Sequence, residues 1–130
     1  MSEKSFLQTE KAPAPVGPYS QGVQAGSFVF LSGQIALDPE SGQMIQDSIE
    51  VETETVIKNL KAILQCRNLT LENVVKTTVY MTDLGQFAAM NQVYAKHFPT
   101  PGPARAAIEV KALPKNANVE IELVALIPQR

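Results

Sequence analysis

An arginine in the C-terminal third of the chain has the chemistry to hold a small acid. Arg105 follows the proline-rich segment 101–103 and enters a mostly apolar run. A planar guanidinium binds a carboxylate through two parallel hydrogen bonds, so Arg105 is a candidate anion-binding residue. The alternative is a structural ion pair with Glu109 or Glu120, and the sequence leaves both interpretations open.

The strands that carry these residues predict how they are arranged. Alternation places Arg105, Ala107 and Glu109 on one face of a strand, and Glu120 with Glu122 on one face of the neighbouring strand. A cation and a carboxylate can therefore meet. The alternative interpretation of Glu120 and Glu122 is a pair of charges at a sheet rim that discourage aggregation.

Three further polar residues complete the candidate set. Tyr19 is presented by a proline-rich loop, Ser32 follows a short apolar segment, and Asn91 interrupts an apolar helical stripe. Each has a structural alternative, which is packing for Tyr19, a turn for Ser32 and a buried hydrogen bond for Asn91. The sequence alone does not separate these alternatives from a role in a site.

The composition indicates one ordinary globular domain, which we expect to span residues 1–130. Cys66 is the only cysteine and His97 the only histidine, so an internal disulfide and the familiar Cys/His zinc spacings are excluded. No apolar run approaches the ~20 residues of a membrane span. The formal net charge is -2 and no basic patch favours nucleic acid, so we expect a cytoplasmic protein without a membrane or nucleic-acid partner.

Turn signals and hydrophobic periodicity predict the element order β, β, α, β, α, β, β. The expected strands are 23–25, 28–32, 74–81, 105–111 and 119–127, and the first two form a hairpin. One helix begins with Asp47 or Ser48 as its cap. The other begins with Asp83 as its cap and ends before Pro99. The first helix carries acidic residues near its start, where the helix dipole favours them: Glu50, Glu52 and Glu54.

The last expected strand is apolar on both faces beyond Glu120 and Glu122. Two helices of the expected lengths cover only one face of a sheet. The other face must pack against a second sheet, most simply one from another copy of the chain. This pattern predicts a homo-oligomer.

Several segments together resemble one known family. The segment 103–114, PARAAIEVKALP, followed by VEIE at 119–122, resembles the C-terminal signature of the RidA/YjgF family. The segments 17–21 (GPYSQ), 32–34 (SGQ) and 75–80 (VKTTVY) resemble further family segments in the same order. The resemblance covers the full length. It implies a chorismate-mutase-like α+β fold, a mixed sheet with two helices on one face, a homotrimer whose sheets form a central barrel, and sites in clefts between subunits.

The resemblance also implies an activity and roles for residues. The family hydrolyses reactive 2-imino acids and their enamine tautomers, such as 2-iminopropanoate and 2-iminobutanoate, to 2-keto acids and ammonia without a cofactor. Arg105 matches the carboxylate-binding arginine, Glu120 the acid that positions or activates water, and Tyr19 a tyrosine that lines the site. Gly33 matches a position of close backbone approach to the ligand. Ser32 and Asn91 match cleft or supporting positions.

One departure from the family pattern limits the chemistry. Many members carry a cysteine where this chain has Ala107, so a mechanism with that thiol as nucleophile is excluded. Because Arg105 beside Glu120 would lower the pKa of that carboxyl, we expect the substrate carboxylate to lie between them. Two alternatives remain: a non-catalytic module that binds a small carboxylate, and the ribonuclease or translation-inhibitor activity ascribed to some relatives, which the acidic charge balance opposes.

Overall fold

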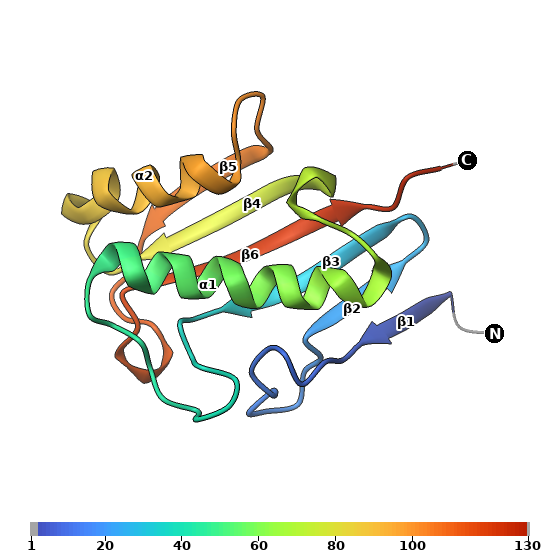
Figure 1. Ribbon diagram of the computed structural model, residues 1–130, viewed down its shortest axis with the longest axis horizontal. Coiled ribbons are helices and arrows are strands. Elements are labelled where there is room, and N and C mark those ends of the chain that lie inside the picture. The colour runs from blue at the N-terminus through green and yellow to red at the C-terminus, as the bar shows by residue number, and fades with distance from the viewer. Residues whose placement is uncertain (1–2, 130) are drawn as a thin grey trace.

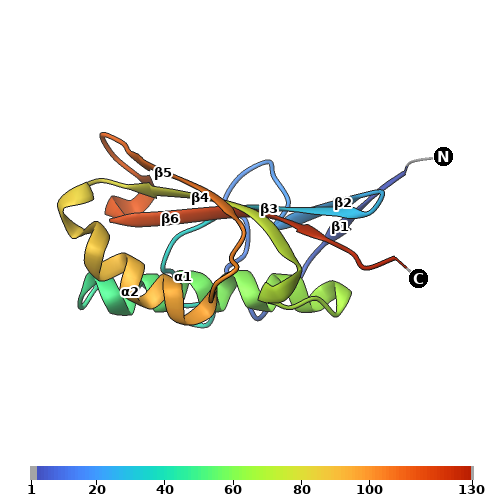
Figure 2. The same cartoon turned by 90° about the horizontal axis from the view of Figure 1, so that it is seen from above.

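A computed structural model describes residues 3–129. The strands are β1 (Lys4–Leu7), β2 (Gly22–Ala25), β3 (Phe28–Gln34), β4 (Val74–Met81), β5 (Ala104–Glu109) and β6 (Val119–Leu126), and the α-helices are α1 (Ile49–Leu64) and α2 (Phe87–His97). Within this described range, the strands form one sheet in the order β1-β2-β3-β6-β4-β5, and both helices cover the same face (Figures 1 and 2). The expected domain also includes residues 1, 2 and 130, which lie outside the described part.

The sheet is mixed, as predicted. Strands β4 and β5 are parallel and the other neighbouring pairs are antiparallel. Helix α2 connects β4 to β5, which is the usual crossover between parallel strands (Figure 1). The α+β class with two helices on one face is therefore confirmed. Within residues 3–129, the helices are too short or too polar to cross a lipid bilayer.

The N-terminal half of the sheet contains the predicted hairpin and one strand that was not predicted. Strands β2 and β3 pair around Gly26, whose φ of 61° suits a tight turn and is costly for residues with a Cβ. Strand β1 pairs antiparallel with β2, with Phe6 opposite Val23. Its sequence is short and begins with polar residues, so its strand character depends on the edge that β2 offers.

Helix α1 follows its predicted pattern closely. Ser48, rather than Asp47, caps it, because the Ser48 hydroxyl accepts a hydrogen bond from Val51 N at 3.1 Å. Hydrophobic periodicity predicts an apolar stripe along this helix, and all of its residues are buried: Ile49, Val56, Ile57, Leu60, Ile63 and Leu64. Glu52 lies in the first turn of the helix, as predicted, but its side chain is buried, since only 1% of the residue is exposed.

The second helix begins later than predicted. Asp83 does act as a cap, since its Oδ1 accepts from Gly85 N at 2.8 Å. However, a 3-10 turn (Leu84–Gln86) comes first, and α2 begins only at Phe87. Glycine is a poor helix former, so Gly85 favours the delay. The helix ends before Pro99, as expected.

The two faces of the sheet differ in how they are covered. On the helix-covered face, β6 buries Val119, Ile121, Leu123 and Ala125. The opposite face carries large apolar side chains that this chain leaves exposed: Phe6 (59%), Phe28 (45%), Phe30 (47%), Ile108 (44%) and Leu126 (37%). Figure 2 shows the sheet edge-on, with both helices on one side. The predicted apolar character of both faces is confirmed, and the second face lacks a cover within the described chain.

One expectation about the C-terminal strands is wrong. Strands β5 and β6 are not neighbours, because β4 lies between them. Arg105 pairs with Thr77 of β4, and Glu120 pairs with Tyr80 of β4. Consecutive strands often pair, but here the parallel crossover through α2 places β5 on the far side of β4.

Candidate functional site

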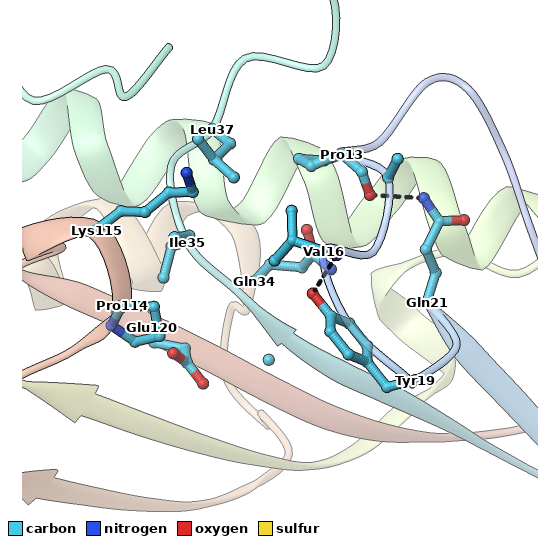
Figure 3. Close-up of a pocket in the computed structure, with 12 residues that line it drawn as sticks. Pro13, Val16, Tyr19, Gln21, Gln34, Ile35, Leu37, Pro114, Lys115 and Glu120 are labelled. Carbon is cyan, nitrogen blue, oxygen red and sulfur yellow. Dashed lines mark hydrogen bonds between the residues drawn. The ribbon is translucent and has the colours of Figure 1, made fainter. Parts of the chain in front are cut away.

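A cavity of about 190 Å³ lies where β3 ends and β6 begins (Figure 3). Its walls are mostly apolar and come from four places in the chain. The lining residues are Pro13, Ala14, Val16, Tyr19, Gln21, Gly33, Gln34, Ile35, Leu37, Pro114, Lys115 and Glu120. Three of the residues predicted for a site, Tyr19, Gly33 and Glu120, are therefore brought together.

The proline-rich loop that forms one wall is held by a buried glutamine. Gln21 is 2% exposed, and its Nε2 donates to the carbonyls of Thr9 at 3.0 Å and Pro13 at 2.8 Å. Its Oε1 accepts from Thr9 N at 2.8 Å. Because prolines lack an N–H and restrict backbone pairing, a side-chain amide must satisfy these carbonyls. Gln21 was not predicted to support this loop, although an amide side chain directly after a proline-rich loop is a usable signal.

Ser32 also supports this loop and does not line the cavity. Its hydroxyl donates to Ser20 O at 2.5 Å, and its N–H donates to Gln21 O at 3.0 Å. Both bonds tie the end of the loop to β3. Tyr19, which is 49% exposed, is oriented by its own loop, since its hydroxyl accepts from Val16 N at 3.4 Å (Figure 3).

Gly33 makes room for the carboxylate of Glu120. A Cβ added at Gly33 would lie 2.9 Å from Glu120 Cδ and 3.1 Å from Cγ, and it would collide with Oε2. The pairing of β3 with β6 shifts register between Leu31 and Gln34, so Gly33 lies within an irregular part of the ladder. Within the described chain, Gly33 gives space to Glu120, whereas the close approach of its backbone to a ligand stays a prediction.

The surroundings of Glu120 favour its protonated form. Burial raises the pKa of this carboxyl above its ordinary value of 4.5, and the nearby charge of Glu122 raises it further. Glu122 is held in place by Tyr80, whose hydroxyl donates to Oε1 at 2.8 Å. This hydrogen bond, followed by burial, raises the pKa of Tyr80. Tyr80 was not predicted as part of the set, and the pairing of β4 with β6 places it beside Glu120.

A second cluster surrounds Arg105 on the helix side of the sheet. Its guanidinium carbon lies 4.7 Å from the ring centre of Tyr94 and 5.2 Å from that of Phe87. Nη1 donates to Asn91 Oδ1 at 2.6 Å. Asn91 therefore interrupts the stripe of α2 in order to orient an arginine. The side chain of Arg105 remains exposed at the edge strand β5.

The ion pair considered for Arg105 is wrong for the described chain. Glu109 instead accepts a hydrogen bond from Leu84 N at 2.9 Å. Among residues 3–129, those that line the cavity of Glu120 do not include Arg105. Ala107 shares the face of Arg105, is exposed, and pairs with Val79.

Arg105 and Glu120 lie on opposite faces of the sheet. Arg105 pairs with Thr77, whose hydroxyl bonds to Tyr94 of α2, so both face the helices. Glu120 alternates with the buried Val119 and Ile121 and therefore faces the uncovered side. The expectation that alternation would let the two meet is thus wrong within one chain. The described chain presents two separate clusters.

Comparisons with known proteins agree with this architecture. The family model described as Endoribonuclease L-PSP matches residues 9–127. A RutC family protein of Pyrococcus abyssi is 48% identical over 122 residues, which cover 94% of this chain and 96% of that protein. The 2-iminobutanoate/2-iminopropanoate deaminase of Mus musculus is 43% identical over 123 residues, covering 95% of this chain and 91% of that protein.

Solved structures give the same result. A Thermotoga maritima protein described as a candidate endoribonuclease superposes with a TM-score of 0.93 at 45% identity, covering 96% of this chain and 98% of that one. Escherichia coli TdcF, solved with bound serine, superposes with a TM-score of 0.89 at 37% identity, covering 95% and 99%. Matches of this extent in sequence and in structure show that the chain belongs to the RidA/YjgF family.

Proposed function

We propose that this protein hydrolyses reactive 2-imino acids and their enamine tautomers, such as 2-iminopropanoate and 2-iminobutanoate, to 2-keto acids and ammonia. The observation that carries the proposal is Glu120, a half-buried carboxyl with a raised pKa at the wall of a mostly apolar cavity. A carboxylate with a raised pKa is a stronger base once it is ionised. The name of the mouse relative supports this substrate class.

The complete site requires two subunits. Arg105 is exposed on the β5 edge, while Glu120 faces the uncovered side of the sheet. We place the Arg105 cluster of one subunit against the Glu120 cavity of the next, in a homotrimer whose uncovered sheet faces form a central barrel. The exposed apolar side chains of that face, among them Phe28 and Phe30, support such burial.

In this arrangement the substrate carboxylate binds Arg105, whose planar fork fixes the acid end and aims C2 at Glu120. Asn91 and the rings of Phe87 and Tyr94 hold the guanidinium in place. Tyr19 and Gly33 border the position of the reacting water. Because Ala107 offers no thiol, water attacks the substrate directly and no covalent bond forms between substrate and protein.

The reaction needs one proton shuttle. The oxygen of water bonds to C2 of the protonated imine while Glu120 accepts a proton from that water. The resulting carbinolamine receives this proton on its nitrogen. The C2–N bond then breaks and ammonia leaves, while the hydroxyl oxygen becomes the carbonyl of the 2-keto acid and its proton passes to the ionised carboxylate of Glu120. Glu120 returns to its starting state when this proton is taken up by the departing ammonia, which becomes ammonium. One such acid/base group contributes roughly 10²- to 10⁴-fold, which suits a substrate that also hydrolyses unaided.

A coupled assay tests this proposal. A threonine dehydratase generates 2-iminobutanoate, and the appearance of 2-ketobutyrate is timed with and without the protein. We expect clear acceleration by the unmutated protein and its loss in Arg105→Ala. Formation at the uncatalysed rate with the unmutated protein would contradict the deaminase.

A non-catalytic module that binds a small carboxylate is the second candidate. The serine bound to Escherichia coli TdcF favours it, because serine is itself a small carboxylate. Arg105 serves both functions, whereas Glu120 as a base serves only the enzyme. Binding of 2-ketobutyrate by calorimetry without any acceleration in the coupled assay would select the module. The net charge of -2 opposes the ribonuclease activity in the family description.

A further inference from the structure

A buried acidic residue of α1 holds the start of β6. Glu52 is 1% exposed, and both of its carboxylate oxygens accept hydrogen bonds from Asn118. Oε2 accepts from the backbone N at 2.7 Å, and Oε1 accepts from Nδ2 at 2.8 Å. The sequence position of Glu52 near the helix start predicted only a favourable interaction with the helix dipole. The contacts instead give it a specific partner at the opposite end of the chain.

Asn118 joins two walls of the Glu120 cavity. Before it comes the 3-10 turn Pro114–Asn116, of which Pro114 and Lys115 line the cavity. After it comes β6, which carries Glu120 two residues further on. Its carbonyl also accepts from Thr82 N at 3.2 Å, next to the end of β4. A shift of Asn118 would therefore move both the turn and the strand.

The turn before Asn118 contains backbone strain that needs such anchoring. Lys115 and Asn116 have φ values of 55° and 56°, in the left-handed region that disfavours residues with a Cβ. Strained conformations of this kind persist where surrounding contacts determine them. Here Gln46 Nε2 donates to Asn116 O at 2.9 Å, and Ala117 N donates to Pro114 O at 3.1 Å. Glu52 supplies the next anchor along the chain.

We propose that Glu52 is a positioning residue for the reaction, acting through Asn118. It fixes the junction between the cavity turn and β6, and so sets the Glu120 carboxylate against Gly33. This inference rests on the proposed function of Glu120. Glu52 itself lies on the helix-covered side of the sheet and does not line the cavity. Figure 1 shows α1 crossing the sheet over β6, so Glu52 of α1 can contact Asn118 next to the start of β6.

A reciprocal exchange of side chains tests the inference. Glu52→Gln leaves a single acceptor and turns an amide donor toward one of the two donors of Asn118. In Glu52→Gln with Asn118→Asp, the glutamine oxygen accepts from the backbone N of residue 118 and its amide donates to the new carboxylate. The double variant therefore restores both hydrogen bonds and the charge of the pair. Glu50→Gln, at an exposed position in the same helical turn, is the matched control.

We expect Glu52→Gln to lower kcat about tenfold or more, because small displacements of a catalytic group are costly. KM should stay within about twofold, since Arg105 is untouched. The double variant should recover to within about threefold of the unmutated kcat, and Glu50→Gln should match the unmutated protein. A lower Tm in Glu52→Gln with unchanged kcat would overturn the inference. If Glu52→Gln fails to fold, Glu52→Asp takes its place, and unchanged kcat in that variant also overturns it.

A second measurement separates this inference from the proposed function. A carbon-13 NMR titration of the Glu120 carboxyl requires no turnover. We expect Glu52→Gln to move the pKa of Glu120 toward its ordinary value and the double variant to return it. If the unmutated protein does not accelerate imine hydrolysis, the proposed function fails while this titration still decides on Glu52. An unchanged titration in Glu52→Gln overturns the inference whatever the assay shows.

Discussion

The Glu120 cavity and the Arg105 edge place an ionisable group in opposite kinds of surroundings. Around Glu120, burial and the charge of Glu122 raise the pKa of a carboxyl. Around Arg105, aromatic rings and Asn91 orient a guanidinium that stays exposed. The carboxyl is enclosed by its own chain, whereas the cation is presented outward.

This difference fits the proposal that the two clusters are halves of one site. Among residues 3–129, no carboxylate forms an ion pair with Arg105, and its contacts are two aromatic rings and the amide of Asn91. Its guanidinium can therefore bind an anion from outside its own chain. Glu120 would lose basicity if Arg105 lay permanently beside it. Their positions on opposite faces of the sheet keep the two residues apart within one chain, as the proposed site between subunits requires.

The largest expected effect comes from removing the carboxylate. Glu120→Gln keeps the size of the side chain but cannot accept a proton, so kcat should fall by roughly 10²- to 10⁴-fold. The coupled dehydratase assay measures this, and calorimetry with 2-ketobutyrate should show that the acid still binds. Turnover at the level of the unmutated protein would remove Glu120 from the chemistry.

Mixing two inactive variants tests whether the halves come from different subunits. Arg105→Ala and Glu120→Gln are each expected to be nearly inactive. If one subunit supplies the arginine and another the glutamate, random exchange of equal amounts restores about a quarter of the sites. The measurement is turnover after joint unfolding and refolding of the mixture, with each variant refolded alone as the control. Activity no higher than that of the separate variants would mean that both residues act within one chain.

Local signals in the sequence predict much of the fold. The hairpin turn at Gly26, the Ser48 cap and the buried stripe of α1 depend on neighbours a few residues away, and these were confirmed. Strand β1 and the order of β4, β5 and β6 depend on pairing between distant segments. No local pattern states which edge a short strand will join, so these features required the structure.

The candidate site shows the same limit. Tyr19, Gly33 and Glu120 were predicted individually and do line one cavity. Alternation was applied correctly within each strand, but it could not relate the faces of β5 and β6, because β4 separates them. Gln21 and Glu52 were missed because their importance lies in buried hydrogen bonds to residues far along the chain.

A smaller effect is expected from adding one methyl group beside Glu120. Gly33→Ala places a Cβ against the carboxylate, and Gly33 has no positive φ that would strain the alanine backbone. The carboxylate must move, so kcat should fall about tenfold while stability changes little. Gly17→Ala is the matched control, because its Cβ would meet the Tyr19 ring at an ordinary 3.6 Å. Equal kcat values for the two variants would show that the exact place of the carboxylate does not matter.

The smallest expected effect is a shift in the pH dependence of kcat/KM that Glu120 sets. Glu120 must be ionised to accept a proton, so kcat/KM should fall as pH drops through its pKa, which burial and then Glu122 raise above 4.5. Glu122→Gln removes the like charge but not the burial, so the acid limb should move to lower pH without reaching the ordinary value. Glu50→Gln removes one negative charge, as Glu122→Gln does, but at an exposed position in α1. The acid limb should stay at the same pH in that variant. If the acid limb of the kcat/KM profile stays at the same pH in Glu122→Gln, burial alone raises the pKa of Glu120. The difference between the Glu120 cavity and the Arg105 edge would then come from the burial of Glu120 and not from the neighbouring charge of Glu122.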